Sequence, residues 1–425
     1  MDDTCRFPGF GPADILVPQG CDLRLWSVVA CDQYTSEPAY WEQVERLVGG
    51  APSALRLTLP EIYLKGDVSE RIGAIGRAMR DYLNRGLFAA HPDSMVLVER
   101  TLSSGRVRRG LVGAVDLEAY DYNRGAQSPV RATEGTVLER IPPRVRVREN
   151  APLELPHVML LADDPGRTVL EPLAERAAEF PLLYDFDLMQ GGGHIAGRLI
   201  AGQALRGVSR ALSALARPDV FSEKYGVSGK APLVFAVGDG NHSLATAKAC
   251  WEQVKKTLPA GASHPARYAL AELVNLHDPA LEFEPIHRVV FGVEPERLLT
   301  EFKAFYPCAA EEKAAGQRIG YVHAGGRGVL TVPNPPCNLA VGTLQNFLDA
   351  CLKEHGGRVD YIHGDGVAEQ LGAQPGNVGF LLPAMEKSDL FKTVVLEGAL
   401  PRKTFSMGNA CDKRFYLEAR RIRPE

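Results

Sequence analysis

The sequence predicts a mixed fold, α/β or α+β, in which helices alternate with strands of a mixed sheet. First, short apolar runs of strand length alternate along the chain with segments whose apolar residues recur at helical spacing. Second, 45% of the 425 residues are apolar and 24% are charged, as in ordinary globular proteins. Third, no repeat of about 20–50 residues is present, which argues against solenoids and propellers.

The first part of the chain contains both kinds of element. Strands are expected at residues 15–18, 26–30, 95–100 and 107–115, the last two being joined by a turn at 103–105. Helices are expected at residues 38–48 and 69–85. The second helix is predicted because one face of it carries Ile72, Ile75, Met79 and Leu83.

The middle of the chain continues the alternation. Between residues 140 and 148, three arginines alternate with Val145 and Val147, which predicts a half-exposed strand; the alternative is a face that binds phosphate or acids. Further strands are expected at residues 157–164, 182–187 and 232–237. Helices are expected at residues 195–215 and 244–256, after a glycine break at 191–193.

The chain is long enough for more than one hydrophobic core. We expect an N-terminal α/β segment at residues 1–130 and a core at 131–290. A smaller C-terminal segment, at residues 291–425, is expected to pack back on that core.

Composition argues against several classes of partner. The net charge of −4 provides no basic field for nucleic acid. No window approaches the ~18 apolar residues of a membrane span, and the acidic N-terminus lacks a signal-peptide pattern, so a cytoplasmic location is expected. The eight cysteines form no Cys-x-x-Cys pair, which argues against structural zinc and a disulfide framework. Cys31 is a possible nucleophile, with a buried thiol as the alternative.

The most informative segment is the turn from Gly238 to Ser243, which joins an apolar strand to a helix. Gly238 and Gly240 permit positive φ and close approach of a ligand. Asn241 and Ser243 are both suited to capping the helix, whose N-terminus attracts anions.

Two side chains of this turn are candidates for catalysis. Asp239 is placed to hold a metal ion or to accept a hydroxyl proton, and His242 to contact phosphate or transfer a proton. This combination is typical of phosphoryl transfer. The alternative is a capped turn whose polar groups only satisfy the backbone, and no Walker sequence is present.

Two other polar segments are candidates for binding. Arg131, Thr133 and Glu134 place a cation, a hydroxyl and a carboxylate within four residues, although a capping box is the alternative. A later segment offers cations and hydroxyls suited to an anionic group, with a solvated loop as the alternative. Its candidate residues are Arg402, Lys403, Thr404 and Ser406.

Several segments together resemble a bacterial and archaeal family, domain of unknown function 1015 (DUF1015). They are residues 28–34, 38–41, 55–63, 131–148, 238–243, 285–289 and 401–408. The resemblance implies a core like that of the ParB/sulfiredoxin superfamily, which includes an archaeal ADP-dependent kinase of free serine. Sulfiredoxin chemistry is not expected, because the turn holds no cysteine, and neither is ParB-like DNA binding.

The kinase's phosphate-binding turn reads Asp-Gly-His-His-Arg. Asp239, Gly240 and His242 match it, whereas Asn241 and Ser243 depart from it, and the missing arginine removes a bidentate phosphate contact. The resemblance also implies Lys403 and Thr404 as substrate-side residues. Glu134 is our candidate for the catalytic glutamate.

The resemblance therefore implies a phosphotransferase. It would use ATP or ADP with Mg²⁺, held by Asp239, and act on the hydroxyl of a small metabolite such as free serine. The alternatives are a nucleotide- or metabolite-binding regulator without turnover, and a phosphoesterase.

Overall fold

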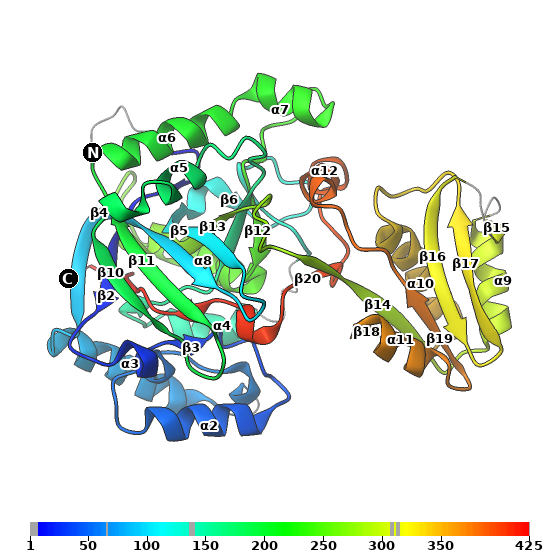
Figure 1. Cartoon of the computed structure of the whole chain (residues 1–425), viewed down its shortest axis with the longest axis horizontal. Coiled ribbons are helices and arrows are strands. Elements are labelled where there is room, and N and C mark those ends of the chain that lie inside the picture. Colours follow the sequence, from blue (N-terminus) through cyan, green and yellow to red (C-terminus); the bar gives the residue numbers. More distant parts are fainter. Residues whose placement is uncertain (1–6, 65–66, 136–140, 307–309, 312–314, 425) are drawn as a thin grey trace. The chain divides into compact units, whose positions relative to one another are not determined.

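The computed structural model describes residues 7–64, 67–135, 141–306, 310–311 and 315–424. The chain divides into two compact units (Figure 1). Unit 1 contains residues 1–281 together with 409–425, and unit 2 contains residues 282–408. Unit 2 is therefore an insertion in the chain of unit 1. The α+β fold expected from the sequence is confirmed.

Unit 1 is built on a mixed sheet with the strand order β10-β11-β4-β5-β13-β9-β12-β7-β6. The pairs β9–β13, β7–β12 and β6–β7 are parallel, and the others in this order are antiparallel. The strands are β4 (Phe88–Thr101), β5 (Val107–Asp116), β6 (Tyr120–Asp121), β7 (Val130–Ala132), β9 (Met159–Ala162), β10 (Leu182–Asp187), β11 (His194–Ile200), β12 (Phe235–Asp239) and β13 (Tyr268–Asn275). Two further strands pair outside this order, β1 (Phe10–Gly11) with β5 and β2 (Ala13–Pro18) with β4.

The two faces of this sheet carry two separate cores. Successive side chains of a strand point to opposite faces, so Val96 and Val98 of β4 belong to one core and Met95 and Leu97 to the other. Helices α1 (Leu23–Trp26), α2 (Pro38–Val48) and α3 (Ser69–Asn84) contribute to the first core. The second core is covered by α5 (Glu171–Ala174), α6 (Gln203–Leu215) and α8 (Asn241–Lys255). Helices α4 (Ile141–Arg148) and α7 (Pro218–Tyr225) complete the unit.

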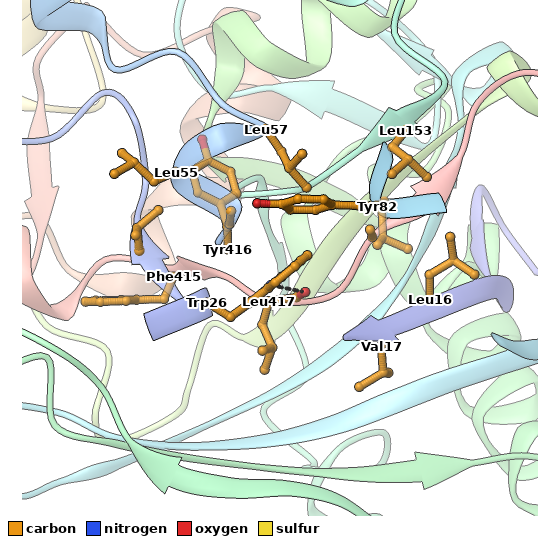
Figure 2. Close-up of a cluster of buried hydrophobic side chains, with 14 of the residues drawn as sticks. Leu16, Val17, Trp26, Leu55, Leu57, Tyr82, Leu153, Phe415, Tyr416 and Leu417 are labelled. Carbon is orange, nitrogen blue, oxygen red and sulfur yellow. Dashed lines mark hydrogen bonds between the residues drawn. The ribbon is translucent and has the colours of Figure 1, made fainter. Parts of the chain in front are cut away.

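Residues 409–425, hereafter the C-terminal segment, return to unit 1 and run through its first core. Within it, β21 (Phe415–Tyr416) pairs with β3 (Val28–Val29), and β22 (Arg420–Arg421) pairs with β8 (Leu153–Glu154). Figure 2 shows Trp26 beside this segment, where its indole Nε1–H donates to the carbonyl of Leu417 at 3.1 Å. Residues nearly 400 positions apart in sequence therefore share one core.

Unit 2 is a smaller α+β body with the strand order β15-β17-β16-β19-β14-β18, and β20 pairs with β14. Its strands are β14 (Phe283–Phe291), β15 (Ala310–Glu311), β16 (Gln317–His323), β17 (Gly326–Val332), β18 (Arg358–His363), β19 (Asn377–Leu381) and β20 (Phe405–Met407). Its helices are α9 (Pro295–Phe305), α10 (Ala340–His355), α11 (Asp365–Gly372) and α12 (Lys387–Glu397).

Three expected elements are wrong in type or extent. Residues 141–148 form helix α4 and not a strand, because prolines at the second and third positions fit the first turn of a helix. Residues 194–200 form strand β11, so the helix expected from 195 begins only at Gln203. Trp26 ends the short helix α1, which leaves a strand of only Val28–Val29 in that region.

The units also differ from the three segments expected. The division at residue 130 falls inside the main sheet, because β7 pairs with both β6 and β12. The second division is observed at 281/282 rather than 290/291, since β14 belongs wholly to unit 2. No helix within the described residues is long and apolar enough to cross a membrane.

Candidate functional site

The turn between β12 and α8 is shaped by Gly240. The fully buried strand residues Phe235, Ala236 and Val237 deliver the chain to this turn. Gly240 adopts a φ of +80° at the N-cap of α8, a left-handed conformation that favours glycine. A Cβ there would lie 3.0 Å from the Cα of Val158. Because glycine offers no side chain to the helix, the first turn of α8 has no side-chain cap.

A cation stands at the start of this helix. Asp239 accepts a hydrogen bond from the Gly240 amide at 2.9 Å through Oδ1. Its Oδ2 lies 3.3 Å from Nζ of Lys413, whose side chain is mostly buried. Lys413 comes from the C-terminal segment, so the last part of unit 1 delivers a positive charge to the turn.

The side chain of Asn241 joins the turn to the end of β7. Its Oδ1 accepts from the Thr133 amide at 3.3 Å, and its Nδ2 donates to the Thr133 hydroxyl at 3.3 Å. The Thr133 hydroxyl in turn donates to the carbonyl of Val237 at 2.7 Å. Two residues expected at the site are therefore brought together, and their polar groups hold the turn in place.

Ser243, in the first turn of α8, contacts a histidine that the sequence analysis did not single out. Its hydroxyl lies 3.0 Å from Nε2 of His157, and Nδ1 of His157 lies 2.7 Å from the Tyr416 hydroxyl. Oδ2 of Asp32 is 3.8 Å from the same Nε2. The four side chains form one connected polar cluster, which we call the His157 cluster.

The charges around Asp32 set its ionisation. Burial opposes the charged form, but the charge on His157, a hydrogen bond from Gln33 and the charge on Lys413 together hold the pKa of Asp32 below its usual value. Burial raises the pKa of the neighbouring Cys31 thiol to about 12. Cys31 is therefore a thiol at neutral pH and lacks the thiolate character of a nucleophile.

A cavity of about 170 Å³ adjoins the His157 cluster. Ser243, His157 and Tyr416 lie in its wall, together with side chains from α3, α4 and the segment at residues 57–64. Asp239 is not part of this wall. Lys413 is likewise absent from it, so the Lys413–Asp239 pair lies outside the cavity wall.

The remaining candidates of unit 1 have other surroundings. Arg131 is buried and donates to the backbone carbonyls of Ser128 and Ala231, both at 2.7 Å. Burial lowers the pKa of Arg131 to about 10. Glu134 is half-buried just after β7. His242 lies in the first turn of α8, where its backbone carbonyl accepts from the Thr246 hydroxyl at 2.7 Å.

Four candidates belong to unit 2: Arg402, Lys403, Thr404 and Ser406. The buried guanidinium of Arg288 holds their loop by donating to the carbonyls of Lys403, at 2.8 Å, and Arg402, at 3.0 Å. Side chains of the loop are held as well: Arg402 donates to the Tyr361 hydroxyl, Thr404 to the Pro401 carbonyl and Ser406 to the Gly408 carbonyl. The site described above is built from unit 1 alone.

Metal-ligand groups are not clustered in the part of the chain that the structure describes. No set of three or more His, Cys, Asp or Glu side chains there is arranged to hold a metal ion. Asp239, the predicted metal ligand, is instead paired with Lys413.

Comparison with known proteins gives a family and several distant structures. A family model described as "Protein of unknown function (DUF1015)" matches residues 17–351. No curated protein matches the chain. A free serine kinase in complex with AMP is 10% identical, with a TM-score of 0.37, covering 73% of this chain and 90% of that one.

Two other solved structures are similar to the same degree. A conserved hypothetical protein from Pyrococcus furiosus is 11% identical with a TM-score of 0.35, covering 73% of this chain and 94% of its own. SbnI from Staphylococcus aureus, with a C-terminal truncation, is 11% identical with a TM-score of 0.37, covering 72% and 87%.

Proposed function

Because this chain belongs to the DUF1015 family, whose function its description leaves open, we propose a function from the site itself: nucleotide-dependent transfer of a phosphoryl group to the hydroxyl of a small metabolite. One observation carries the proposal. An uncapped helix start, opened by a left-handed glycine, lies beside a lysine held by an aspartate. Free amides at a helix N-terminus and a nearby cation are what a phosphate group requires.

The positive charge at this site comes from Lys413 and not from Arg131. Both guanidinium contacts of Arg131 are made with backbone carbonyls, whereas Lys413 stands at the turn itself. In phosphoryl transfer most of the catalysis is positioning and stabilisation of charge on the phosphoryl oxygens. Lys413 and the start of α8 would supply that charge, with Asp239 fixing the position of Lys413.

The His157 cluster would handle the proton of the acceptor hydroxyl. Nε2 of His157 accepts the proton, and the ionised Asp32 at 3.8 Å stabilises the imidazolium that forms. Asp239, Glu134 and His242 remain our sequence-based candidates for catalysis, with Gly238, Gly240, Asn241 and Ser243 as candidates for phosphate binding.

ATP or ADP with Mg²⁺ is the cofactor set that we propose. Mg²⁺ bound through substrate phosphates needs only one or two protein carboxylates, and Asp239 is our candidate, with its Oδ1 on the Gly240 amide and its Oδ2 paired with Lys413. An ion that arrives with the nucleotide would take the place of Lys413 beside Oδ2.

A second candidate function is a nucleotide- or metabolite-binding regulator without turnover. Ser243 stands where the turn of the resembled kinase has an arginine, and its hydroxyl already contacts His157. The site would then bind phosphate more weakly than the kinase turn and lack one group that stabilises the transferring phosphoryl.

Nucleotide binding is the first test. ATP, ADP, CTP and GTP are titrated with and without Mg²⁺, and thermal unfolding is followed. A nucleotide at 100 times its Kd stabilises the protein by about 2.7 kcal/mol. Lys413→Met is expected to weaken nucleotide binding at least ten-fold. Lys255→Met, at the C-terminal end of α8 and away from the turn, is expected to leave it unchanged. If no nucleotide binds, the proposal is wrong.

Turnover is the second test, and it separates the two candidate functions. With a nucleotide that binds, phosphorylated product is measured for serine and other small alcohols. His157→Gln is expected to lower kcat by about 10²–10⁴-fold, the usual contribution of a general base, with nucleotide Kd unchanged. Binding without transfer to any alcohol would favour the regulator.

A further inference from the structure

We propose that the cavity beside the His157 cluster binds an uncharged, largely apolar small molecule that carries one hydroxyl group. The cavity measures about 170 Å³ and its wall includes Ser243. An apolar cavity of about 150 Å³ is enough for benzene. The expected ligand is therefore of the size of a small substituted benzene.

Aliphatic side chains make up most of the wall. They include Leu57, Leu59, Met79, Val147, Leu155 and Leu270. Leu57 is among the residues drawn in Figure 2, where it lies in the same region as Tyr82 and Tyr416. Such a wall gains free energy by removing apolar surface of a ligand from water. It offers no compensation for a ligand that is polar all round.

The charged groups in the wall are already paired with one another. Arg144 contacts Glu61, and Arg148 lies 2.5 Å from Glu154. A zwitterion such as serine would have to open one of these pairs in a partly buried setting, at a large cost in desolvation. This argues for an uncharged ligand.

The hydroxyls in the wall have partners within the protein, and Ser243 is the one that contacts Nε2 of His157, the proposed proton acceptor. Thr58 donates to the Ala54 carbonyl at 3.0 Å and Thr246 to the His242 carbonyl at 2.7 Å. The Ser243 hydroxyl lies 3.0 Å from Nε2 of His157. A serine hydroxyl has one donor and two acceptor positions, so Ser243 retains capacity for one hydroxyl of a ligand.

The position of the cavity relates it to the proposed reaction. Ser243 belongs to the first turn of α8, at whose start the phosphate would bind. The ligand would be the phosphoryl acceptor, a role that rests on the proposed function, whereas the binding itself does not. Its hydroxyl oxygen would form a bond to phosphorus as the bond to the leaving oxygen of the nucleotide breaks, and its proton would pass to His157.

The test uses 4-fluorobenzyl alcohol and 4-fluorotoluene as probes, observed by ¹⁹F NMR with the full-length protein and no nucleotide. Both are expected to bind, and serine is expected not to displace them. Ala247→Leu fills the cavity from α8 and should weaken both probes at least ten-fold. Ala214→Leu, at an exposed position of α6, is the matched control and should bind as the wild type does.

A second variant identifies the polar contact. Ser243→Ala is expected to weaken 4-fluorobenzyl alcohol about 3- to 10-fold, the value of one hydrogen bond, and to leave 4-fluorotoluene unchanged. Ala151→Leu provides a second filled cavity should Ala247→Leu unfold. The proposal is overturned if serine competes with the probes, or if a folded filled variant binds them like the wild type. Nucleotide titrations fail or succeed independently of these results.

Discussion

Gly240 shows how a single backbone angle positions the candidate site. Its φ of +80° turns the chain from β12 into α8, and its lack of a Cβ lets it pass the backbone of Val158. A residue with a Cβ in this conformation costs roughly 1–2 kcal/mol. At this residue, stability and the geometry of the helix start are linked.

We therefore expect Gly240→Ala to lower the free energy of unfolding by about 1–3 kcal/mol, from strain and from the close approach to Val158. Urea denaturation measures the loss. Gly207→Ala is the matched control, because Gly207 lies inside α6 with nothing within 4 Å of the added Cβ. It should stabilise the protein by about 0.5–1 kcal/mol. Equal effects of both changes would contradict this account of Gly240.

The sequence allowed prediction of only part of the site at this scale. The turn from Gly238 to Ser243 is local, so its strand, its glycine and its helix could all be recognised from neighbouring residues. His157, Asp32 and Lys413 could not, because their contacts depend on three distant segments meeting in the fold. The valines and arginines of α4 were misread because their alternation matches a strand, although the preceding prolines suit a helix start.

At the scale of elements, the hairpin β10–β11 carries a charge cluster. His194, at the start of β11, lies 2.8 Å from both Asp185 and Asp187 of β10. The hydrogen bond with Asp187, followed by the contacts with Asp185, raises the pKa of His194 above its usual value. A helix was wrongly expected to begin at residue 195. The segment instead forms strand β11, because it pairs with β10 on one side and β4 on the other, and these pairings depend on the tertiary fold.

This cluster predicts a pH dependence. The pKa of His194 is raised in the folded state, so His194 contributes to the free energy of unfolding. This contribution is complete below the unfolded pKa of about 6.5 and is lost as the pH rises through the folded pKa. The side chain is 40% exposed, so the contribution should stay below about 1 kcal/mol. Protection factors of β10 amides, measured by hydrogen exchange, should fall over this range relative to His194→Gln. Identical pH profiles for the two proteins would contradict the prediction.

At the scale of the whole molecule, unit 1 is completed by its C-terminal segment. Arg414 contacts both Glu272 and Glu418, and all three side chains are buried. Burial opposes ionisation of Glu272, yet Arg414 and Arg108 hold its pKa below the usual value. Phe415, Tyr416 and Leu417 fill the first core beside these charges.

Two deletions should therefore behave differently. Removing unit 2 and joining residue 281 to 409 through a short Gly-Ser linker should leave unit 1 folded, because the pairing of Phe283 with Met407 places the two ends of unit 2 side by side. Ending the chain at residue 408 should unfold unit 1, since loss of Arg414 breaks a buried pair at a cost of about 3–5 kcal/mol and leaves Glu272 with Arg108, 3.8 Å away. Near-UV circular dichroism and urea denaturation distinguish the two. A folded truncated chain would contradict this view of the segment.

The same arrangement has a consequence for synthesis on the ribosome. Residues 409–425 are translated only after all of unit 2, so Arg414, the nearer cationic partner of Glu272, is absent while most of unit 1 is already outside the exit tunnel. Unit 2 can fold as it emerges, because its strands and helices are contiguous in sequence. Unit 1 must wait until the last residues of this segment appear. A product cut short before residue 409 would therefore expose an incomplete core, and cellular proteases would remove it.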